Sequence, residues 1–325
     1  MGDASMSPAD ERDLVSDWAA DLADTGHAAP TSRRYVPAVR AFLVWFADEN
    51  HEPFTPARLT PIDLTGYTQR IQQTAKASTV NVHVCALRSF CAWLTDNGYV
   101  ERNPALRLKA IGMPEPLAPK SLKPVHVNAL LREAQQTRYA ARDYALIQLM
   151  VQTGIRIGEC AALLVGDVQL GERQGQMIIR TGKGNKTRTV PLNASARQAL
   201  AEYLGPLWKV ESNVKAVATA WAKQSTTSPL WRSQKGGALS SRAIGEVIEG
   251  LVEVCFQRNL VPSDTTPHTL RHTFATNYLK DHPGDLVGLA ALLGHSSLET
   301  THIYVQPSAD DLAQRVEQTR LNAYS

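Results

Sequence analysis

Three prolines and Gly112 fall within residues 105–123, a stretch with few large apolar side chains. Proline has no backbone N–H to donate and glycine adds conformational freedom, so such a stretch is typical of a connection between domains. The chain has 325 residues, which leaves each flank long enough to bury a core of its own. We therefore predict two domains, at residues 1–110 and 124–325, joined by a linker at 111–123.

The first domain is predicted to be a bundle of four helices. Apolar side chains recur in it at the three- and four-residue spacings of a buried helix face, as with Trp18 and Leu22. Ser7 and Thr31 are placed to cap the first two helices. Gly98 follows the fourth, where a left-handed residue is commonly needed. The predicted helices cover about residues 8–24, 32–46, 61–73 and 78–96.

The second domain is predicted to be mainly helical with a small β-sheet, which makes the chain α+β. Helical spacing of apolar residues extends over residues 125–137 and 140–153. Two short runs with β-branched residues follow, at 177–179 and 187–192, and the Gly-rich turn between them predicts a β-hairpin. Helices are expected again from there to the C-terminus.

The net charge of +3 says little about a partner until the chain is divided. Residues 1–110 carry 11 Lys and Arg against 13 Asp and Glu, whereas residues 111–325 carry 23 against 18. The two parts therefore have net charges of −2 and +5. The surplus in the second part is consistent with an anionic ligand there, although an excess of this size is common in proteins that never bind DNA.

Composition argues against a membrane protein and against a metal centre built on cysteine. No apolar run reaches the roughly 18–20 residues that span a bilayer. The acidic N-terminus also lacks the basic and apolar segments of a secretory leader, so we expect a cytoplasmic protein. The four cysteines form no Cys-x-x-Cys pair and lie among apolar neighbours, which predicts buried free thiols at Cys85, Cys91, Cys160 and Cys255.

Arg156 stands between two isoleucines in the segment 153–159, an unusual place for a charge that is seldom buried unless it is paired. One explanation is an ion pair with Glu159, three residues further along a helix. The other is a site for an anion, since a guanidinium offers paired N–H donors to a phosphate. The segment alone is compatible with both.

The predicted hairpin turn carries four cations and no acid, at Arg180, Lys183, Lys186 and Arg188. Its glycines permit tight turn geometry. Such a turn could bring Lys183 to a phosphate or into a groove of DNA, or it could be an ordinary solvated tip.

Pro267 suits the first position of a helix, with Thr266 as its cap. His268 and Arg271 then share one face near the helix N-terminus, where anions are favoured, and His272 is expected to have a structural role. A capped surface turn is the alternative explanation.

Gly294 can end a helix in the left-handed conformation, and Ser296 with Glu299 can open the next helix as a capping box. His295 would then lie on the elbow between the two helices, and Tyr304 about two turns further on. A half-buried structural tyrosine is the alternative explanation.

In combination and order, these residues resemble the tyrosine recombinase family of phage integrases and Xer-type resolvases. The pattern is an Arg, a Lys in a Gly-Lys-Gly-x-Lys turn, His-x-x-Arg, Gly-His and a Tyr nine residues after that His. The resemblance spans residues 125–320, and the first 110 residues resemble more loosely the family's SAM-like core-binding domain. It implies two domains that close as a clamp around DNA, without the arm-binding domain of the larger phage integrases. The implied active-site residues are Arg156, Lys183, His268, Arg271, His295 and Tyr304.

The resemblance implies that Tyr304 attacks a DNA phosphodiester and forms a 3′-phosphotyrosyl bond, whose energy allows rejoining without ATP, a metal or any other cofactor. In-line attack builds negative charge on the non-bridging oxygens, which Arg156, Arg271 and His295 would stabilise as donors. His268 would accept the phenol proton, and the lysine of the hairpin turn would protonate the departing 5′ oxygen.

The implied partner is double-stranded DNA with specific core sites. A homo-tetramer would assemble on it, alone or with a related recombinase, so the protein would associate with the nucleoid. The amphipathic stretch 308–321 would dock on a neighbouring protomer, as a comparable tail does in the family, and the outcome could be integration, excision or resolution of DNA. Residues expected to contact DNA are Arg33, Arg34, Arg40, Lys76, Asn81, Arg88, Arg180, Lys186 and Arg188.

Two other functions fit parts of the same pattern. A type IB topoisomerase uses a similar set of Arg, Lys, His and Tyr on a single duplex, without partner sites. A non-catalytic DNA-binding regulator on the same fold would be expected to lack at least one of the six positions, whereas all six are filled here. The Xer-like spacing and the C-terminal tail favour the recombinase.

Overall fold

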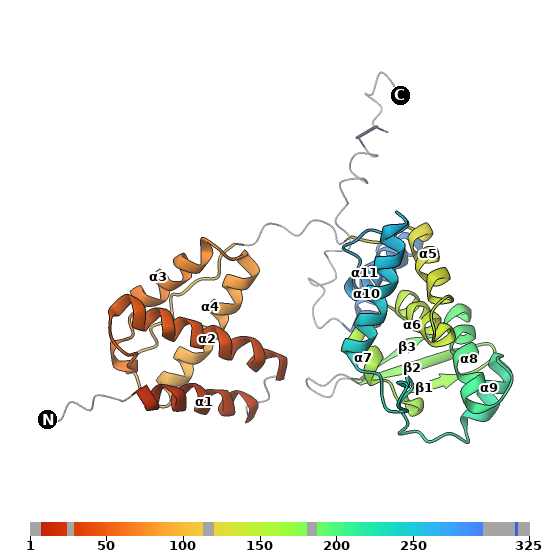
Figure 1. Ribbon diagram of the computed structural model, residues 1–325, viewed down its shortest axis with the longest axis horizontal. Helices are drawn as coiled ribbons and strands as arrows, with labels where there is room; N and C mark the ends of the chain where they lie inside the picture. Colours follow the sequence, from red (N-terminus) through yellow and green to blue (C-terminus); the bar gives the residue numbers. More distant parts are fainter. Residues whose placement is uncertain (1–7, 25–28, 113–119, 181–186, 295–315, 318–325) are drawn as a thin grey trace. The chain divides into compact units, whose positions relative to one another are not determined.

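The computed structural model describes residues 8–24, 29–112, 120–180, 187–294 and 316–317 (Figure 1). The described chain is mostly helical with a three-stranded sheet, which confirms the predicted fold class. It divides into two compact units, Met1–Glu115 and Pro116–Ser325. Within the described ranges, none of the helices has both the length and the apolar character needed to cross a membrane.

The first unit is a helical bundle around an aromatic core. Trp18, Phe42, Phe54 and Phe90 are buried, and Trp18 meets Phe90 edge to face with ring centroids 5.3 Å apart. Each buried ring removes a large apolar surface from water, which is the main source of stability for a domain of this size. The elements are α1 (Pro8–Asp24), α2 (Ala29–Asn50), the 3₁₀ helix η1 (Pro56–Arg58), α3 (Pro61–Gln72) and α4 (Ala77–Asp96).

The four predicted helices of this unit are confirmed, but one predicted cap is wrong. Helix α2 begins at Ala29, so Thr31 lies inside the helix. The reason is Pro30, whose missing N–H costs nothing in a first turn and whose fixed φ suits a helix. Gly98 has φ +76°, the left-handed conformation predicted just past α4. Ser7 lies outside the described residues.

After α4 the chain folds back along this helix. Ala105 and Leu108 are buried in the core of the first unit. The Asn81 amide exchanges two hydrogen bonds with the backbone of Ile111, at 3.0 and 2.8 Å, and Arg88 donates through Nε to the carbonyl of Leu108 at 2.7 Å. Asn81 and Arg88, which were expected to contact DNA, therefore hold the outgoing chain against α4.

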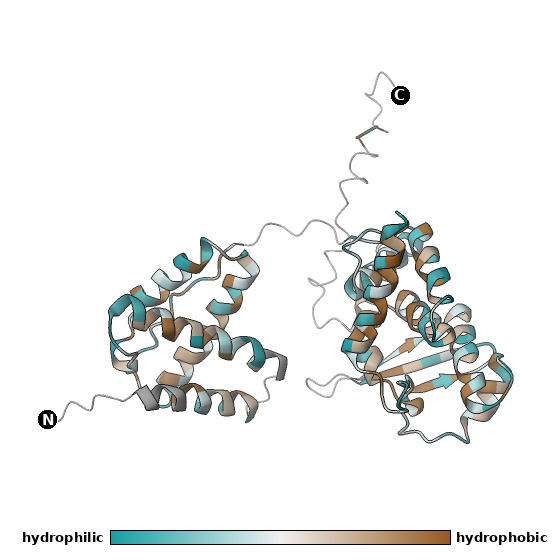
Figure 2. Cartoon of the chain, viewed as in Figure 1, coloured by the Kyte–Doolittle hydropathy of each residue, from teal (hydrophilic) through white to brown (hydrophobic). Residues whose placement is uncertain are grey.

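The second unit contains most of the helices. They are α5 (Pro124–Ala134), α6 (Ala140–Thr153), α7 (Ile157–Ala162), α8 (Ala194–Trp208), α9 (Val214–Trp221), α10 (Ser241–Gln257), α11 (Pro267–Asp281) and α12 (Leu286–Leu293), with the 3₁₀ helix η2 (Val165–Asp167). Helix α6 is buried along most of its length and contacts α5, α8 and α11. Helices α5 and α10 carry apolar residues on one side and hydrophilic residues on the other (Figure 2), so each can bury one side and still face water.

The sheet consists of β1 (Val168–Leu170), β2 (Gly175–Arg180) and β3 (Thr187–Pro191), antiparallel in that order. The pair β2–β3 is the predicted hairpin, which is confirmed. Strand β1 was not predicted, because three residues are too few to show an alternating pattern. The register sets Met177 between Val168 and Val190, and all three side chains are buried.

The prediction of buried cysteines is wrong at one position. Cys91, Cys160 and Cys255 are buried, but Cys85 is exposed. Its neighbours Val84 and Ala86 are buried, and Cys85 faces outward because consecutive residues of a helix point in different directions. Burial raises the pKa of the Cys91 and Cys160 thiols to about 12, so both stay protonated.

Candidate active site

Of the six implied active-site residues, the structure describes three: Arg156, His268 and Arg271. The other three, and one residue expected to contact DNA, lie outside the described residues: Lys183, His295, Tyr304 and Lys186. The described part of the site therefore consists of the junction between α6 and α7 and the first turns of α11.

Arg156 is positioned by the turn that ends α6. Gly154 ends the helix in the left-handed conformation, with φ +63°, Ile155 is buried, and Arg156 is the first residue before α7. A Cβ atom at Gly154 would lie 2.4 Å from Cδ1 of Phe274 and 2.9 Å from Cδ2 of Leu293. The end of α6 therefore packs directly against α11 and α12, and glycine is the residue that fits there.

Replacing Gly154 with alanine should destabilise the protein by about 3 kcal/mol, because a left-handed alanine costs about 1–2 kcal/mol and overpacking adds a similar amount. Urea unfolding followed by circular dichroism measures the loss. The control is Gly284→Ala: Gly284 also has a positive φ, +85°, but a Cβ there would meet nothing within 4 Å. That variant should lose only the backbone cost of about 1–2 kcal/mol. Equal losses would contradict the close packing at Gly154.

Glu159 orients the Arg156 side chain. Arg156 donates through Nη1 to Oε1 of Glu159 and through its backbone N–H to Oε2, both at 2.9 Å. The ion pair predicted as one explanation of Arg156 is therefore present. The Arg156 side chain is still 41% exposed, which leaves it accessible to an anion from solvent, so the two explanations are compatible.

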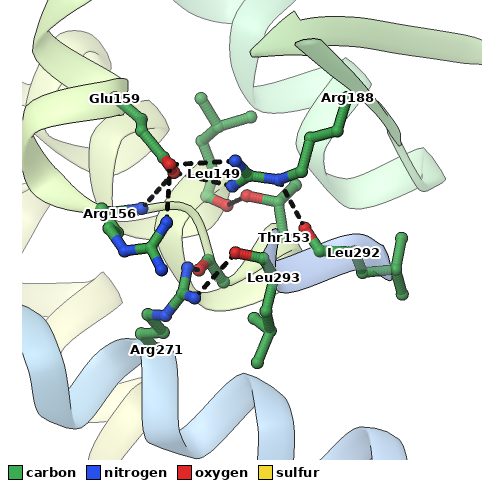
Figure 3. Close-up of polar contacts among 9 residues, drawn as sticks. Leu149, Thr153, Arg156, Glu159, Arg188, Arg271, Leu292 and Leu293 are labelled. Atoms are coloured by element: carbon green, nitrogen blue, oxygen red, sulfur yellow. Dashed lines mark hydrogen bonds and ion pairs between the residues drawn. The ribbon is translucent and has the colours of Figure 1, made fainter. Parts of the chain in front are cut away.

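Arg188 of β3 binds the same carboxylate from another side. Its Nη1 and Nη2 atoms donate to Oε1 and Oε2 of Glu159 at 2.9 and 2.7 Å, and its Nε donates to the carbonyl of Leu292 at 2.8 Å (Figure 3). The side chain is only 11% exposed. The structure thus gives Arg188 a task different from the predicted contact with DNA: it joins β3 to α7 and to the end of α12.

The Glu159 carboxyl is ionised at any physiological pH. Burial would raise its pKa, but the hydrogen bonds from Arg188 and from the Arg156 backbone, with the charges of both guanidiniums, outweigh burial and lower the pKa to about 2. Glu159 is therefore a permanent anion that holds two arginines. Its contribution to stability is present above the ordinary pKa of 4.5 and is lost as the pH falls towards 2.

Arg271 joins the ends of α6 and α12. Its side chain is buried, and it donates through Nη1 to the carbonyl of Gly154 at 2.6 Å and through Nη2 to that of Leu293 at 2.8 Å (Figure 3). Both carbonyls lie at helix C-terminal ends, which leave acceptors unpaired and carry the negative end of the helix dipole. Gly154 precedes Arg156 by two residues, a span of at most ~7 Å. The structure therefore brings Arg156 and Arg271 into one site.

His268 is exposed on the first turn of α11, three residues before Arg271. The predicted start of this helix is confirmed: Thr266 caps it by accepting a hydrogen bond from the Thr269 N–H, and Pro267 is its first residue. The N-terminal end of a helix carries the positive end of its dipole, which favours a bound anion. The imidazole of His268 is thus held where a phosphate near Arg271 would be in reach.

His272, one turn further on, should make the protein sensitive to mild acid. Burial, with the charges of His268 and Arg271, lowers its pKa from 6.5 to about 4. Between these values the unfolded chain binds a proton that the folded protein does not, so stability falls as the pH drops from 6.5 to 4. Urea unfolding across this range should show a shallower pH dependence for His272→Asn than for the parent, and an unchanged slope would contradict the half-buried, neutral imidazole.

The remaining cations expected to contact DNA lie on the surface. On the first unit these are Arg33, Arg34 and Arg40 of α2 and Lys76, which directly precedes α4. On the second unit Arg180, at the end of β2, is 61% exposed and forms an ion pair with Asp167 at 2.7 Å. Their contacts with DNA stay a prediction.

The interior position of Arg188 could have been predicted from the sequence. Alternate residues of a strand share one face, so Arg188 shares its face with Val190. Val190 and Ile179, which lies opposite Arg188 in the register, are both 1% exposed. The lysines of the neighbouring turn favour a contact of Arg188 with DNA, which is the prediction made above.

Comparison with known proteins gives two family models that match the chain. Residues 120–310 match the phage integrase family, and residues 15–98 match the N-terminal SAM-like domain of phage integrases. The chain is 31% identical over 286 residues to tyrosine recombinase XerC of Pelobacter propionicus, with 87% of each chain covered. It is 33% identical over 321 residues to XerC of Methylobacterium sp., with 95% of this chain and 93% of the other covered.

Solved structures share the fold. The XerH site-specific recombinase bound to difH substrate has a TM-score of 0.64 at 22% identity, over 88% of this chain and 78% of that chain. The Tn1549 transposon integrase in complex with transposon right end DNA has a TM-score of 0.65 at 18% identity, over 95% and 99%. At these identities the likeness concerns the fold.

Proposed function

The chain belongs to the phage integrase family of tyrosine recombinases, and from this and the geometry above we propose that it cuts and rejoins DNA at specific sites through Tyr304. The observation that carries the proposal is the convergence of Arg156 and Arg271, which lie far apart in the sequence and meet at the end of α6. Paired guanidiniums have the donor geometry that a phosphate accepts.

The two arginines would stabilise the transition state of phosphodiester attack. Negative charge grows on the non-bridging oxygens as the nucleophile enters in line. Arg156 is fixed by Glu159, and Arg271 by two carbonyls, so both donors are oriented before the DNA arrives. Preorganised donors need no rearrangement during the reaction, and each is typically worth about 10²–10³ in rate.

Tyr304 would be the nucleophile. A free phenol has a pKa near ~10, and the cations around a bound phosphate would favour the phenolate. Other tyrosines are made poorer nucleophiles by their surroundings: burial raises the pKa of Tyr67 to about 12 and also raises that of Tyr203. For Tyr278, the hydrogen bond to Asp285 raises the pKa.

Proton transfers would involve the remaining residues of the set. His268 would take the proton of Tyr304 as its oxygen bonds to phosphorus, and Lys183 would give a proton to the departing 5′ oxygen. His295 would add a donor to the non-bridging oxygens. The 3′-phosphotyrosyl bond conserves the energy of the broken bond, so attack by a 5′ hydroxyl reverses the sequence and rejoins DNA without ATP.

Double-stranded DNA is the partner. Of the structurally similar proteins, XerH is described bound to its difH substrate and the Tn1549 integrase in complex with transposon right end DNA. In this chain the exposed cations on α2 and before α4 would bind the backbone of the duplex, a contact that weakens as salt rises. The two domains would then close as a clamp around the duplex.

A recombination assay tests the proposed function. A plasmid with two direct copies of the DNA that flanks the protein's own gene is incubated with the full chain in EDTA without ATP. We expect excision of the segment between the copies. Relaxation of plasmids with and without these copies, but no excision, would instead indicate a topoisomerase. If the protein binds DNA but neither excises nor relaxes it, a related recombinase is added. Excision that is still absent would indicate a non-catalytic DNA-binding regulator.

Strand exchange should also depend on the C-terminal tail. We propose that four protomers assemble on two sites and that residues after Ser308 dock on a neighbouring protomer. Deleting them should leave binding to a single site within about twofold but abolish excision, since assembly is lost while each protomer keeps its DNA contacts. Gel-shift and excision assays on the same preparation measure both, and unchanged excision would defeat the idea.

A further inference from the structure

We propose that Arg188 is a positioning residue for catalysis, which sets where Arg156 and the end of α12 lie relative to each other. The inference rests on the proposed function, since it concerns the site in which Arg156 and Arg271 act. Arg188 belongs to β3, whereas Arg156 directly precedes α7 and Arg271 lies in α11. Its role would be to connect their supports.

Arg188 holds the carboxylate of Glu159, which in turn holds Arg156. Arg188 and Glu159 form a two-bond, charge-assisted pair with side chains 11% and 9% exposed. Oε1 of Glu159 accepts from both Arg188 and Arg156. Because the planar guanidinium of Arg188 engages both carboxylate oxygens, it fixes the plane of the carboxylate and hence the direction from which Arg156 is held.

Arg188 also binds the C-terminal end of α12. The Nε of Arg188 donates to the Leu292 carbonyl at 2.8 Å, and the next carbonyl, that of Leu293, accepts from Arg271. Adjacent peptide groups at the end of α12 are therefore held by two different arginines. A shift of Arg188 would move the acceptor that positions Arg271.

The guanidinium of Arg188 packs closely against Gly294. This residue ends α12 in the left-handed conformation, with φ +65°, as predicted from the sequence. A Cβ there would lie 2.7 Å from Nη1 and 3.0 Å from Cζ of Arg188. The backbone directly before His295 thus rests on the guanidinium, and the position admits glycine because Arg188 occupies the space that a side chain would need.

The test compares single-turnover cleavage of two nicked duplexes at saturating protein. One has a normal phosphodiester at the cleavage position, and the other has a methylphosphonate, in which a methyl group replaces one non-bridging oxygen and removes its charge. Arg188→Lys keeps the positive charge but cannot make all three hydrogen bonds. A misplacement of about 1 Å in a site can cost about 10²-fold, so we expect Arg188→Lys to cleave the phosphodiester about 100-fold more slowly.

The methylphosphonate separates positioning from general damage. With less charge to stabilise, cleavage depends less on the arginines, so the loss in Arg188→Lys should shrink to about tenfold or less. Arg142→Lys is the matched control, because Arg142 is also a buried arginine, with a 10% exposed side chain paired to Asp143 at 2.8 Å. Arg142 lies at the opposite end of α6 from Gly154. Any loss of cleavage rate in Arg142→Lys should therefore be the same on the phosphodiester and the methylphosphonate.

Gly294→Ala serves as a second variant if Arg188→Lys fails to fold, since the added methyl group displaces the guanidinium without removing it. It should show the same difference between the two substrates. Equal losses on both substrates, or cleavage by Arg188→Lys at the parent rate, would overturn the inference. Absence of cleavage by the parent protein would instead count against the proposed function.

Discussion

Tyr304→Phe should abolish recombination and covalent attachment to DNA while leaving DNA affinity within about twofold. The substitution removes one oxygen, which is the atom that would bond to phosphorus, and the ring keeps its size. Loss of a covalent nucleophile typically costs on the order of 10⁶-fold in rate. Excision of a plasmid segment and a denaturing gel of the protein–DNA adduct measure the effect, and a gel shift measures the affinity.

Tyr278→Phe is the matched control, because it removes the same atom from a tyrosine that donates to Asp285 at 2.6 Å, outside the polar network of Arg156 and Arg271. This variant should recombine DNA at close to the parent rate. If Tyr304→Phe still recombines DNA, or if the control variant loses recombination instead, Tyr304 is not the nucleophile.

Arg271→Ala should have the second largest effect, with two separable parts. Cleavage should fall by about 10²–10³-fold, since one preorganised donor to the transition state is lost. Stability should fall by about 2–4 kcal/mol, because the carbonyls of Gly154 and Leu293 would be left buried without this donor. Single-turnover cleavage and urea unfolding measure the two parts separately.

Arg142→Ala controls for the loss of stability. It removes a buried guanidinium from the same unit, at the other end of α6, so it should also be destabilising. Its cleavage rate, measured well below the unfolding midpoint, should stay within about threefold of the parent, as expected for a site outside the catalytic network. Cleavage by Arg271→Ala within tenfold of the parent would contradict the role of Arg271.

Helix ends that depend on one or two neighbouring residues are predicted well from the sequence. Pro267 with Thr266 marks the start of α11, and Gly294 marks the end of α12, because proline, threonine and glycine each have backbone preferences that hold in most contexts. The buried run at residues 140–153 gives α6 its observed bounds. These elements place Arg156 just after the end of α6 and Arg271 near the start of α11, as predicted.

The sequence is less informative where partners come from distant segments. The sequence predicts that Arg271 donates to a phosphate, but its bonds to Gly154 and Leu293 depend on how three helices meet. Likewise Glu159 was paired correctly with Arg156 because the two are local, while its stronger contact with Arg188 joins α7 to β3. Such contacts follow from packing of the whole unit, which local spacing does not encode.

Direct identification of the residue that bonds to DNA tests the central claim. Full-length protein would be trapped on a nicked duplex in EDTA, digested with protease and nuclease, and analysed by mass spectrometry for a peptide that carries a nucleotide. The account predicts one modified peptide, with the 3′-phosphate on Tyr304. A nucleotide on any other residue, or cleavage that leaves no protein–DNA bond, would contradict it.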